Sequence, residues 1–308
     1  IDFQSTIRLK LEMHHLVHFF YFCGINKTKV MSRFQRIQCK FSVPFLLLLF
    51  FVLPSRILKA QEIEKPLLEQ LPDTSLFEAH HHVEGNDTLP YRLYRSQRAD
   101  TMTEALPLVI FLHGAGERGN DNFIQLKHCI RFFLDDTVTG CYPFLLMVPQ
   151  CPNEKRWVNT DWTLPEHQME SEPTNELRGV MSVLDSLVDG GAVDASQVYI
   201  CGISMGGYGV WDALQRWPEK FAAAIAICGG GDPAYAHSMK DVPVYVFHGL
   251  RDSIVMHSRS VQMYARLRNA GNEEAILVAY PELGHGCWDE AFSTPGLFKW
   301  LFGKKKGD

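Results

Sequence analysis

The 308-residue chain has no long hydrophobic run, no strong excess of one charge and no repeated or low-complexity segment. Its longest apolar run, residues 45–53, has nine residues, whereas a helix that crosses a membrane needs about 20. Proline and glycine number 16 and 23, near their average shares, which excludes collagen-like chains. With 46% hydrophobic and 21% charged residues, the composition is that of a globular protein.

Positive and negative charges are separated along the sequence. Residues 1–60 contain nine Lys/Arg and two Asp/Glu, whereas the remaining 248 residues contain 21 Lys/Arg and 33 Asp/Glu. The main part of the chain is therefore acidic. Nucleic acids and anionic membranes bind basic surfaces, so we expect neither as a partner of this part.

The N-terminal region has the pattern of a secretory signal peptide. From Met31, basic residues precede the nine-residue apolar run, Pro54 ends that run, and Ala60 is a small residue suited to cleavage. We expect residues 1–60 to be a signal-peptide region, with Met31 as the translation start and residues 1–30 upstream of it. The mature protein is then secreted or periplasmic, without stable membrane association. The alternative is an uncleaved signal that anchors the protein in a membrane.

The sequence also lacks the usual metal-site motifs. None of the six cysteines after residue 60 has C-x-x-C spacing, and no H-E-x-x-H is present. We therefore expect no metal. Cys141 and Cys151 flank a predicted strand and are candidates for a disulfide in an oxidising compartment. Cys201 and Cys228 adjoin apolar runs and are expected to be buried thiols.

Strands and helices alternate through residues 90–303, after a polar leader over residues 61–89. The expected strands are 90–96, which is placed at a sheet edge, 108–112, 144–148, 198–201, 222–227, 242–247 and 275–279. The expected helices are 123–134, 177–187, 205–217, 261–267 and 288–301, and residues 151–173 form a long loop. This alternation predicts an α/β fold: one domain with a mostly parallel central sheet flanked by helices, followed by a polar tail over residues 304–308.

A G-x-S-x-G motif, Gly202 to Gly206, follows a predicted strand and opens a predicted helix. In this context a serine on a sharp strand-to-helix turn stands clear of the sheet as a nucleophile. The two glycines keep the neighbouring strand and helix from clashing. Ser204 is therefore the candidate nucleophile; the alternative is a tight turn without chemistry.

A serine nucleophile requires a base, and three histidines are candidates. His285 lies in a glycine-flanked turn after the last predicted strand, where it is able to reach Ser204. His248 ends a strand and His113 opens a loop. Both positions suit a structural role better, so His285 is the expected base.

Three acidic residues are candidates for the partner of the base. Asp252 follows the strand ending at residue 247, Asp232 follows the strand before it, and Glu282 is near His285 in sequence. The chain order nucleophile, acid, histidine is the one expected for a nucleophile on such a turn. Asp252 satisfies it best, and Asp232 is second.

A glycine-rich segment, residues 113–119, follows the buried strand 108–112. In this position it supplies one backbone N–H of an oxyanion hole, and the amide of Met205 supplies the other. Ala115 is the expected donor, with Gly116 second. No G-K-[ST] follows, so a nucleotide site is excluded and no cofactor is expected.

Taken together, these motifs resemble the α/β-hydrolase superfamily. Within it, the sequence is similar to secreted bacterial carboxylesterases also labelled predicted peptidases, near prolyl-oligopeptidase-like, feruloyl-esterase and polyhydroxybutyrate-depolymerase-type enzymes. The similar segments are 108–120, 148–152, 198–211, 247–255 and 283–288. The resemblance implies Ser204 as nucleophile, Asp252 and His285 as its triad partners, and ester hydrolysis without a cofactor. We expect no propeller, immunoglobulin-like or carbohydrate-binding domain beside the catalytic segment, and on that expectation esterase activity is favoured over peptidase activity.

We therefore expect a secreted serine carboxylesterase that acts on a small-molecule or saccharide-linked ester of a short acid. A serine peptidase or an acyltransferase using the same site is the alternative, and a non-catalytic binding protein on a hydrolase scaffold is the second. Trp157 and Trp288 are the expected substrate-binding residues, with Trp162 a third candidate; the alternative role for tryptophans is packing. Glu117 and Arg118 are expected to form an ion pair that stabilises their loop; the alternative is that they bind a polar group of the substrate.

Overall fold

The structure is a computed structural model that describes residues 71–307. The chain divides into two units, residues 1–68 and 69–308, and every described residue belongs to the second. The expected signal-peptide region and its cleavage at Ala60 lie outside the described residues. Within residues 71–307, no helix has the length and hydropathy needed to cross a membrane.

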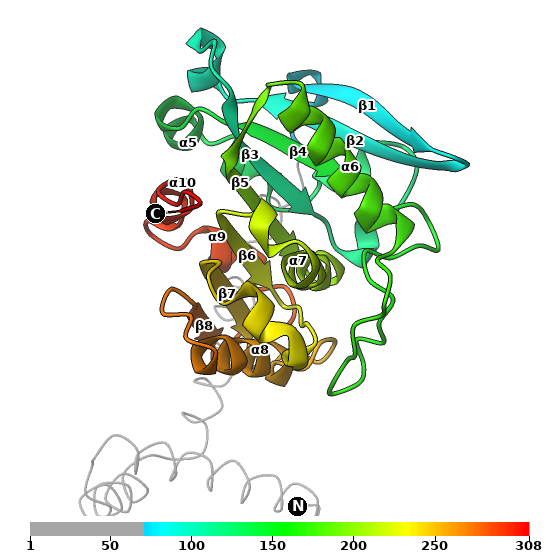
Figure 1. Ribbon diagram of the computed structural model, residues 1–308, viewed down its shortest axis with the longest axis vertical. Helices are drawn as coiled ribbons and strands as arrows, with labels where there is room; N and C mark the ends of the chain where they lie inside the picture. Colours follow the sequence, from blue (N-terminus) through cyan, green and yellow to red (C-terminus); the bar gives the residue numbers. More distant parts are fainter. Residues whose placement is uncertain (1–70, 308) are drawn as a thin grey trace, which may run out of the picture. The chain divides into compact units, whose positions relative to one another are not determined.

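A mostly parallel sheet of eight strands forms the centre of the described unit (Figure 1). The strands are β1 (Phe77–Glu84), β2 (Asp87–Arg95), β3 (Leu106–Leu112), β4 (Leu145–Pro149), β5 (Val193–Ile203), β6 (Ala223–Ile227), β7 (Val244–Gly249) and β8 (Ile276–Tyr280). Their order in the sheet is β1-β2-β4-β3-β5-β6-β7-β8. β2 pairs antiparallel with β1 and β4, and all other neighbours are parallel. The predicted fold class is confirmed.

Seven α-helices and several short 3-10 turns connect these strands in the described residues. The helices are α4 (Ile130–Phe133), α5 (Asp136–Cys141), α6 (Asn175–Asp189), α7 (Met205–Arg216), α8 (Ser258–Asn269), α9 (Trp288–Phe292) and α10 (Leu297–Phe302). The 3-10 turns are Thr74–Leu76, Gln97–Thr101, Ala115–Glu117, Ile124–Leu126, Pro218–Lys220 and Pro233–Met239. Residues 151–173 form a loop without regular helix or strand, as predicted.

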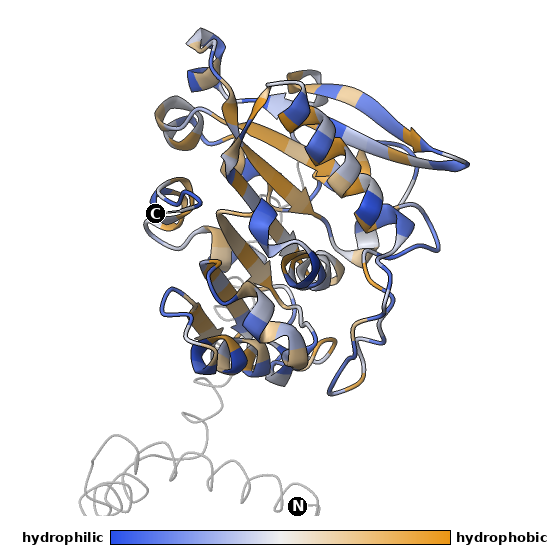
Figure 2. Cartoon of the chain, in the orientation of Figure 1, coloured by the Kyte–Doolittle hydropathy of each residue, from blue (hydrophilic) through white to orange (hydrophobic). Residues whose placement is uncertain are grey.

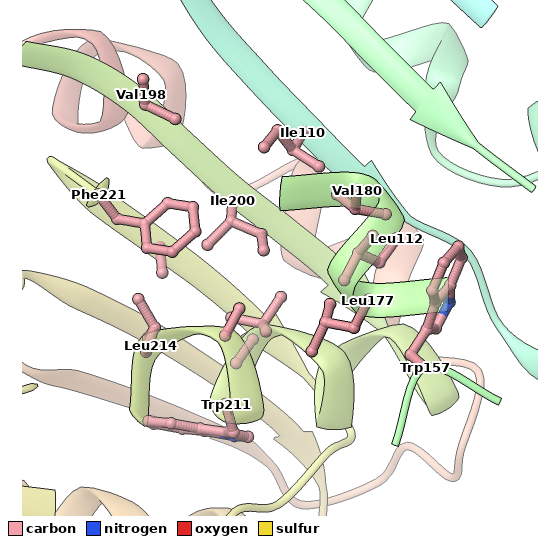
Figure 3. Close-up of a cluster of buried hydrophobic side chains, with 14 of the residues drawn as sticks. Ile110, Leu112, Trp157, Leu177, Val180, Val198, Ile200, Trp211, Leu214 and Phe221 are labelled. Atoms are coloured by element: carbon pink, nitrogen blue, oxygen red, sulfur yellow. The ribbon is translucent and has the colours of Figure 1, made fainter. Parts of the chain in front are cut away.

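Helices cover both faces of the sheet because its central strands are apolar on both sides, as Figure 2 shows for β3 to β7. Side chains alternate between faces along a strand. Leu108 and Ile110 of β3 therefore belong to one core cluster, with α6, α7 and α8. Val109 and Phe111 belong to another, with α4, α5, α9 and α10. Figure 3 shows part of the first cluster, in which Val198 and Ile200 of β5 face α7, the helix that carries Leu214.

The N-terminal boundary of the folded region lies earlier than predicted. Residues 77–84, expected to belong to the polar leader, form β1, and β1 pairs with β2 along its whole length. β2 lies between β1 and β4, so the strand expected at the sheet edge is an inner one. β1 is an edge strand with exposed faces, and its polar composition resembles that of a loop. For this reason the sequence does not predict it as a strand.

Two predicted helices are interrupted. The segment 123–134 is a 3-10 turn followed by the short α4, separated at Cys129, whose φ of 67° ends regular helix. The segment 288–301 is divided into α9 and α10 by residues 293–296, where Pro295 precedes Gly296 with φ 79°. Helical spacing of apolar residues continues across both breaks, and for this reason the sequence predicts single helices.

The C-terminal segment, predicted as a polar tail, contacts the rest of the domain. Lys304 forms an ion pair with Glu274, and the Lys306 N–H donates to the Ser196 carbonyl at 2.9 Å. These contacts extend the folded region beyond residue 303.

Candidate active site

Ser204 lies on a sharp turn between β5 and α7. Its backbone has φ 53° and ψ −118°, a conformation that L-residues rarely adopt. The turn requires glycine on both sides, because a Cβ at Gly202 would overlap the Gly206 carbonyl and a Cβ at Gly206 would overlap that of Leu112. The strained backbone is held by a hydrogen bond from the Ser204 N–H to the Ile227 carbonyl of β6, at 2.9 Å.

His285 reaches Ser204 from the loop after β8. Its Nε2 lies 2.8 Å from Ser204 Oγ, and its Nδ1 lies 2.7 Å from Asp252 Oδ2. With the ring proton on Nδ1, that nitrogen donates to the carboxylate and Nε2 accepts the serine hydroxyl. The three side chains thus form one continuous hydrogen-bonded chain.

Asp252 follows β7 with a fully buried side chain. Its Oδ1 accepts the backbone N–H groups of Ile254 and Val255, each at 2.9 Å. Its Oδ2 is 3.1 Å from His248 Nε2 in addition to the contact with His285. Burial raises the pKa of the Asp252 carboxyl, but the hydrogen bonds from both histidines and the backbone outweigh it and hold the pKa well below its usual range.

The alternative bases and acids have other partners. His248 is buried, its Nδ1 lies 2.7 Å from Ser260 Oγ, and its Nε2 contacts the same Asp252 oxygen as His285 does. Asp232 accepts the N–H groups of Met169 and Ala234, each at 2.9 Å. Glu282 forms an exposed ion pair with Arg251.

His113 shapes the glycine-rich loop. Its ring is fully buried, and burial lowers its pKa to about 4, so the imidazole is neutral. Nδ1 donates to the Gly114 carbonyl at 2.6 Å, and Nε2 accepts the Cys151 N–H at 2.9 Å. His113 therefore ties the loop after β3 to the loop after β4, in the structural role predicted for it.

A cavity of about 290 Å³ opens at Ser204. It is lined by Gly114, Ala115, Gly116, Glu117, His128, Trp162, Ile203, Ser204, Met205, Tyr208, Ile254, Val255, His285 and Trp288. Ala115 and Met205, the expected backbone donors, thus both border it. The Met205 N–H belongs to the first turn of α7, where N–H groups have no intrahelical partner and the helix dipole is positive. Two larger hollows, of about 420 and 650 Å³, have lining residues that do not include Ser204.

The prediction that Trp157 binds substrate is wrong. Its side chain is fully buried in the core, where Nε1 donates to the His113 carbonyl at 3.1 Å and the ring lies near Leu112 (Figure 3). Trp162, from the same loop, lines the cavity instead, and Trp288 lines it as predicted. The loop 151–173 has no periodicity, so the sequence gives no indication of which tryptophan points inward.

Sequence reasoning also missed part of the cavity wall. Tyr208 is four residues after Ser204 on α7, and that helical spacing would have placed both on one face. Glu117 pairs with His128, 3.5 Å apart, and not with Arg118, whose Nε donates to the Ala115 carbonyl at 2.9 Å. Burial raises the pKa of the Glu117 carboxyl. The cavity therefore combines aromatic walls with one polar pair.

One cluster in the described residues has the donor types of a metal site: Cys228, His248 and Asp252, with atoms within 4.8 Å of one another. These atoms are engaged in hydrogen bonds among the site's own side chains. Asp252 Oδ2 accepts from two histidines, and Cys228 Sγ contacts Cys287. The arrangement is that of a hydrogen-bonded site.

The chain is similar to known esterases in sequence and in fold. Residues 99–294 match the Phospholipase/Carboxylesterase family. A probable carboxylesterase SOBER1-like of Arabidopsis thaliana is 24% identical over 211 residues, which are 64% of this chain and 78% of that protein. The crystal structure of a thermostable esterase matches with TM-score 0.69 and 30% identity, covering 76% of this chain and 64% of that one. A ferulic acid esterase matches with TM-score 0.55 and 16% identity, covering 74% and 98%, and shows the fold alone.

The family match covers more than half of the chain and includes Ser204 and Asp252 as well as His285. The resemblance to the α/β-hydrolase superfamily is thereby confirmed. The chain spans 64% of the thermostable esterase, so the reaction and substrates of that whole protein are not carried over. The chain belongs to the phospholipase/carboxylesterase family of α/β-hydrolases and is a carboxylic ester hydrolase.

Proposed function

We propose that the protein hydrolyses short-acyl or carbohydrate-linked esters through a catalytic triad of Ser204, His285 and Asp252. The observation that carries this proposal is the series of hydrogen bonds that joins these residues, with contacts of 2.8 and 2.7 Å, where Ser204 and His285 line the cavity. Each proton transfer and bond formation in ester hydrolysis can be assigned to a named atom of these residues.

In the first half of the reaction, Ser204 Oγ attacks the ester carbonyl carbon while His285 Nε2 takes the hydroxyl proton. The backbone N–H groups of Ala115 and Met205 stabilise the negative charge that develops on the carbonyl oxygen. The ester C–O bond then breaks, and His285 gives its proton to the departing alcohol. The acyl group remains on Ser204.

In the second half, water replaces the alcohol. His285 Nε2 takes a proton from water, the hydroxide attacks the acyl carbon, and the Ser204–acyl bond breaks as His285 returns a proton to Oγ. Asp252 keeps the imidazole oriented and stabilises its charged form throughout. The depressed pKa of Asp252 keeps it ionised, as this role requires.

The size and lining of the cavity favour a substrate with a short or aromatic acyl group. A volume of about 290 Å³ is at the small end of ligand sites, which run from about 300 to 1,000 Å³. Trp162, Tyr208 and Trp288 provide flat apolar walls, and the Glu117–His128 pair is suited to a substrate hydroxyl. A saccharide-linked or phenolic ester matches this mixture.

The alternatives differ in what they require of the same site. A peptidase must also position a peptide and protonate a poorer leaving group, whereas an acyltransferase must favour an alcohol over water in the second half. A non-catalytic binding protein would not form a covalent acyl-enzyme. The hydrogen bonds that join Ser204, His285 and Asp252 favour hydrolysis over binding without catalysis.

We further propose that the protein is exported and works as a soluble secreted or periplasmic enzyme. The support is the sequence pattern before Ala60, with the basic start, the nine-residue apolar run and the small residue at the cleavage position. N-terminal sequencing of protein recovered from the periplasm or medium is the test. A first residue near Gln61 supports export, and a membrane-bound product that retains residues 31–60 contradicts it.

The catalytic proposal is tested by covalent labelling. A fluorophosphonate probe incubated with the purified protein should attach to Ser204, located by peptide mass spectrometry. Ser204→Ala should not be labelled, whereas Ser293→Ala, which changes an exposed serine, should label as wild type does. Wild-type protein that stays unlabelled, or labelling at another residue, contradicts the proposal.

A further inference from the structure

Two thiols that the hydrolytic mechanism does not use lie in contact beside the active site. Cys228 Sγ and Cys287 Sγ are 3.3 Å apart, and both side chains are fully buried. Cys228 directly follows β6, while Cys287 caps α9 two residues after His285. Cys228 Sγ also donates to the His285 carbonyl at 3.2 Å. The pair therefore joins the loop that carries His285 to the carboxyl end of β6, whose last residue, Ile227, accepts the Ser204 N–H.

The backbone at Cys228 is strained. Its φ is 50°, in the left-handed region that favours glycine, and three glycines follow it. Glycine at position 228 would adopt this conformation without cost, but a thiol stands there and points at a second thiol. Strain of this kind persists where the surroundings hold it and is often associated with function.

We propose that Cys228 and Cys287 form a disulfide that fastens the His285 loop to the end of β6. The thiolate of one cysteine attacks a small disulfide oxidant such as glutathione disulfide, whose S–S bond breaks and releases one glutathione thiolate. The second cysteine thiolate then attacks this mixed disulfide and releases the other glutathione. One S–S bond is lost and one is formed, and the two protein protons pass to the glutathione thiolates.

Burial decides when the cross-link forms. The hydrogen bond with Cys287 and the apolar surroundings both raise the pKa of the Cys228 thiol, and only the thiolate reacts. The native, closed site is thus slow to oxidise, and the bond forms while the His285 loop is open during folding. All six cysteines of residues 71–307 are free thiols in the structure, Cys228 and Cys287 included; of the earlier candidate pair, Cys141 is exposed and Cys151 is buried.

The cross-link would join residues 59 positions apart. The enclosed segment contains β7, Asp252, α8, β8 and His285, and so includes two of the three side chains in the hydrogen-bonded chain. Closing so long a loop restricts the unfolded chain and so favours the folded state. The disulfide therefore stabilises the base and acid against local opening without touching the substrate.

Peptide mapping tests the proposal and is independent of catalytic activity. The purified protein is unfolded in denaturant, refolded with glutathione disulfide, alkylated under denaturing conditions and digested with trypsin without reduction. Each cysteine lies on its own tryptic peptide, 221–240 or 269–299. We expect the two peptides to be recovered as one species that separates on reduction. Recovery of both peptides only as alkylated or glutathione-bound single chains overturns the proposal, whatever the esterase assay shows.

Thermal unfolding provides the second readout. Dithiothreitol should lower the melting temperature of the oxidised wild type by about 5–10 °C. The same shift should be absent in Cys287→Ala and retained in Cys141→Ser, which changes an exposed thiol. A shift that persists in Cys287→Ala, or that vanishes in Cys141→Ser, contradicts the assignment.

Discussion

Among single residues, Asp252 is held by four hydrogen bonds. Two histidines contact the same carboxylate oxygen, and two backbone N–H groups bind the other. His248 is anchored in turn by Ser260. The carboxylate is therefore fixed before substrate arrives, and His285 receives a defined orientation and proton position from it.

Replacing Asp252 by asparagine should be severe. The amide keeps the size of the side chain but loses the charge that orients and stabilises protonated His285, so we expect kcat to fall by about 10⁴-fold, as in serine proteases. Asp232→Asn should change kcat by less than about tenfold, since Asp232 binds backbone N–H groups in another loop. Steady-state kinetics on p-nitrophenyl acetate compare them. The opposite order of the two effects would show that the acid is misassigned.

Replacing each of the two tryptophans of the loop 151–173 should have a different effect: one substitution should lower the stability of the protein, and the other should weaken substrate binding. Trp157→Ala removes a fully buried side chain and should lower the free energy of unfolding by about 3–5 kcal/mol. Trp162→Ala removes a cavity wall and should raise KM for aromatic-acyl esters, with a much smaller effect on unfolding. Urea titration and kinetics of both variants provide the check. A larger loss of stability in Trp162→Ala would reverse the assignment.

At the level of elements, the buried strands were predictable and the boundary elements were not. Apolar runs such as Leu106–Leu112 have few alternatives to a strand covered on both faces. β1 contains Ala79 and three histidines between acidic residues, and Phe77 is its one buried residue. The divisions at Cys129 and Gly296 depend on single backbone angles that helical periodicity does not encode.

The loop after β3 should make stability depend on pH through His113. Its pKa is about 4 when folded and about 6.5 when unfolded, so the unfolded state binds the extra proton in between. The contribution of His113 to stability should therefore fall as pH drops from 6.5 to 4, by up to about 1.4 kcal/mol per pH unit, and this contribution should level off below pH 4. Urea titrations at pH 7, 6, 5 and 4 measure the slope.

His113→Gln is the variant that assigns this effect. Removing the titrating ring should make the fall in stability between pH 6.5 and 4 less steep, although the variant is less stable at pH 7 because the bonds to Gly114 and Cys151 are weakened. His167, whose pKa burial also lowers to about 4, contributes in the same window and remains in the variant. An unchanged slope in His113→Gln would show that the buried ring is not the source.

At the level of the whole molecule, the candidate site was predictable where a motif has a required context. Ser204 was identified from its place between a strand and a helix, and Asp252 and His285 from chain order after later strands. Parallel strands bring such loops to one edge of the sheet. The cavity walls come from an aperiodic loop and from the Glu117–His128 contact between separate segments, and a single sequence does not specify these.

The size of the cavity should set the substrate range. We expect p-nitrophenyl acetate and butyrate to be hydrolysed with kcat/KM at least about 100-fold above palmitate, because a cavity of about 290 Å³ is too small to enclose a palmitoyl chain. The loop over residues 151–173 is rich in charged and amide side chains and offers little apolar surface for a lipid interface. Faster cleavage of palmitate, or of peptidyl substrates, would contradict this range.

The most direct measurement for the central claim compares wild type with Ser204→Ala on p-nitrophenyl acetate, with circular dichroism as the control for folding. Loss of the nucleophile should reduce kcat by about 10⁵–10⁶-fold. The melting temperature should not decrease, since removing Oγ leaves the strained turn and its glycines in place. Hydrolysis by Ser204→Ala at the wild-type rate, with the same melting curve, would contradict the account.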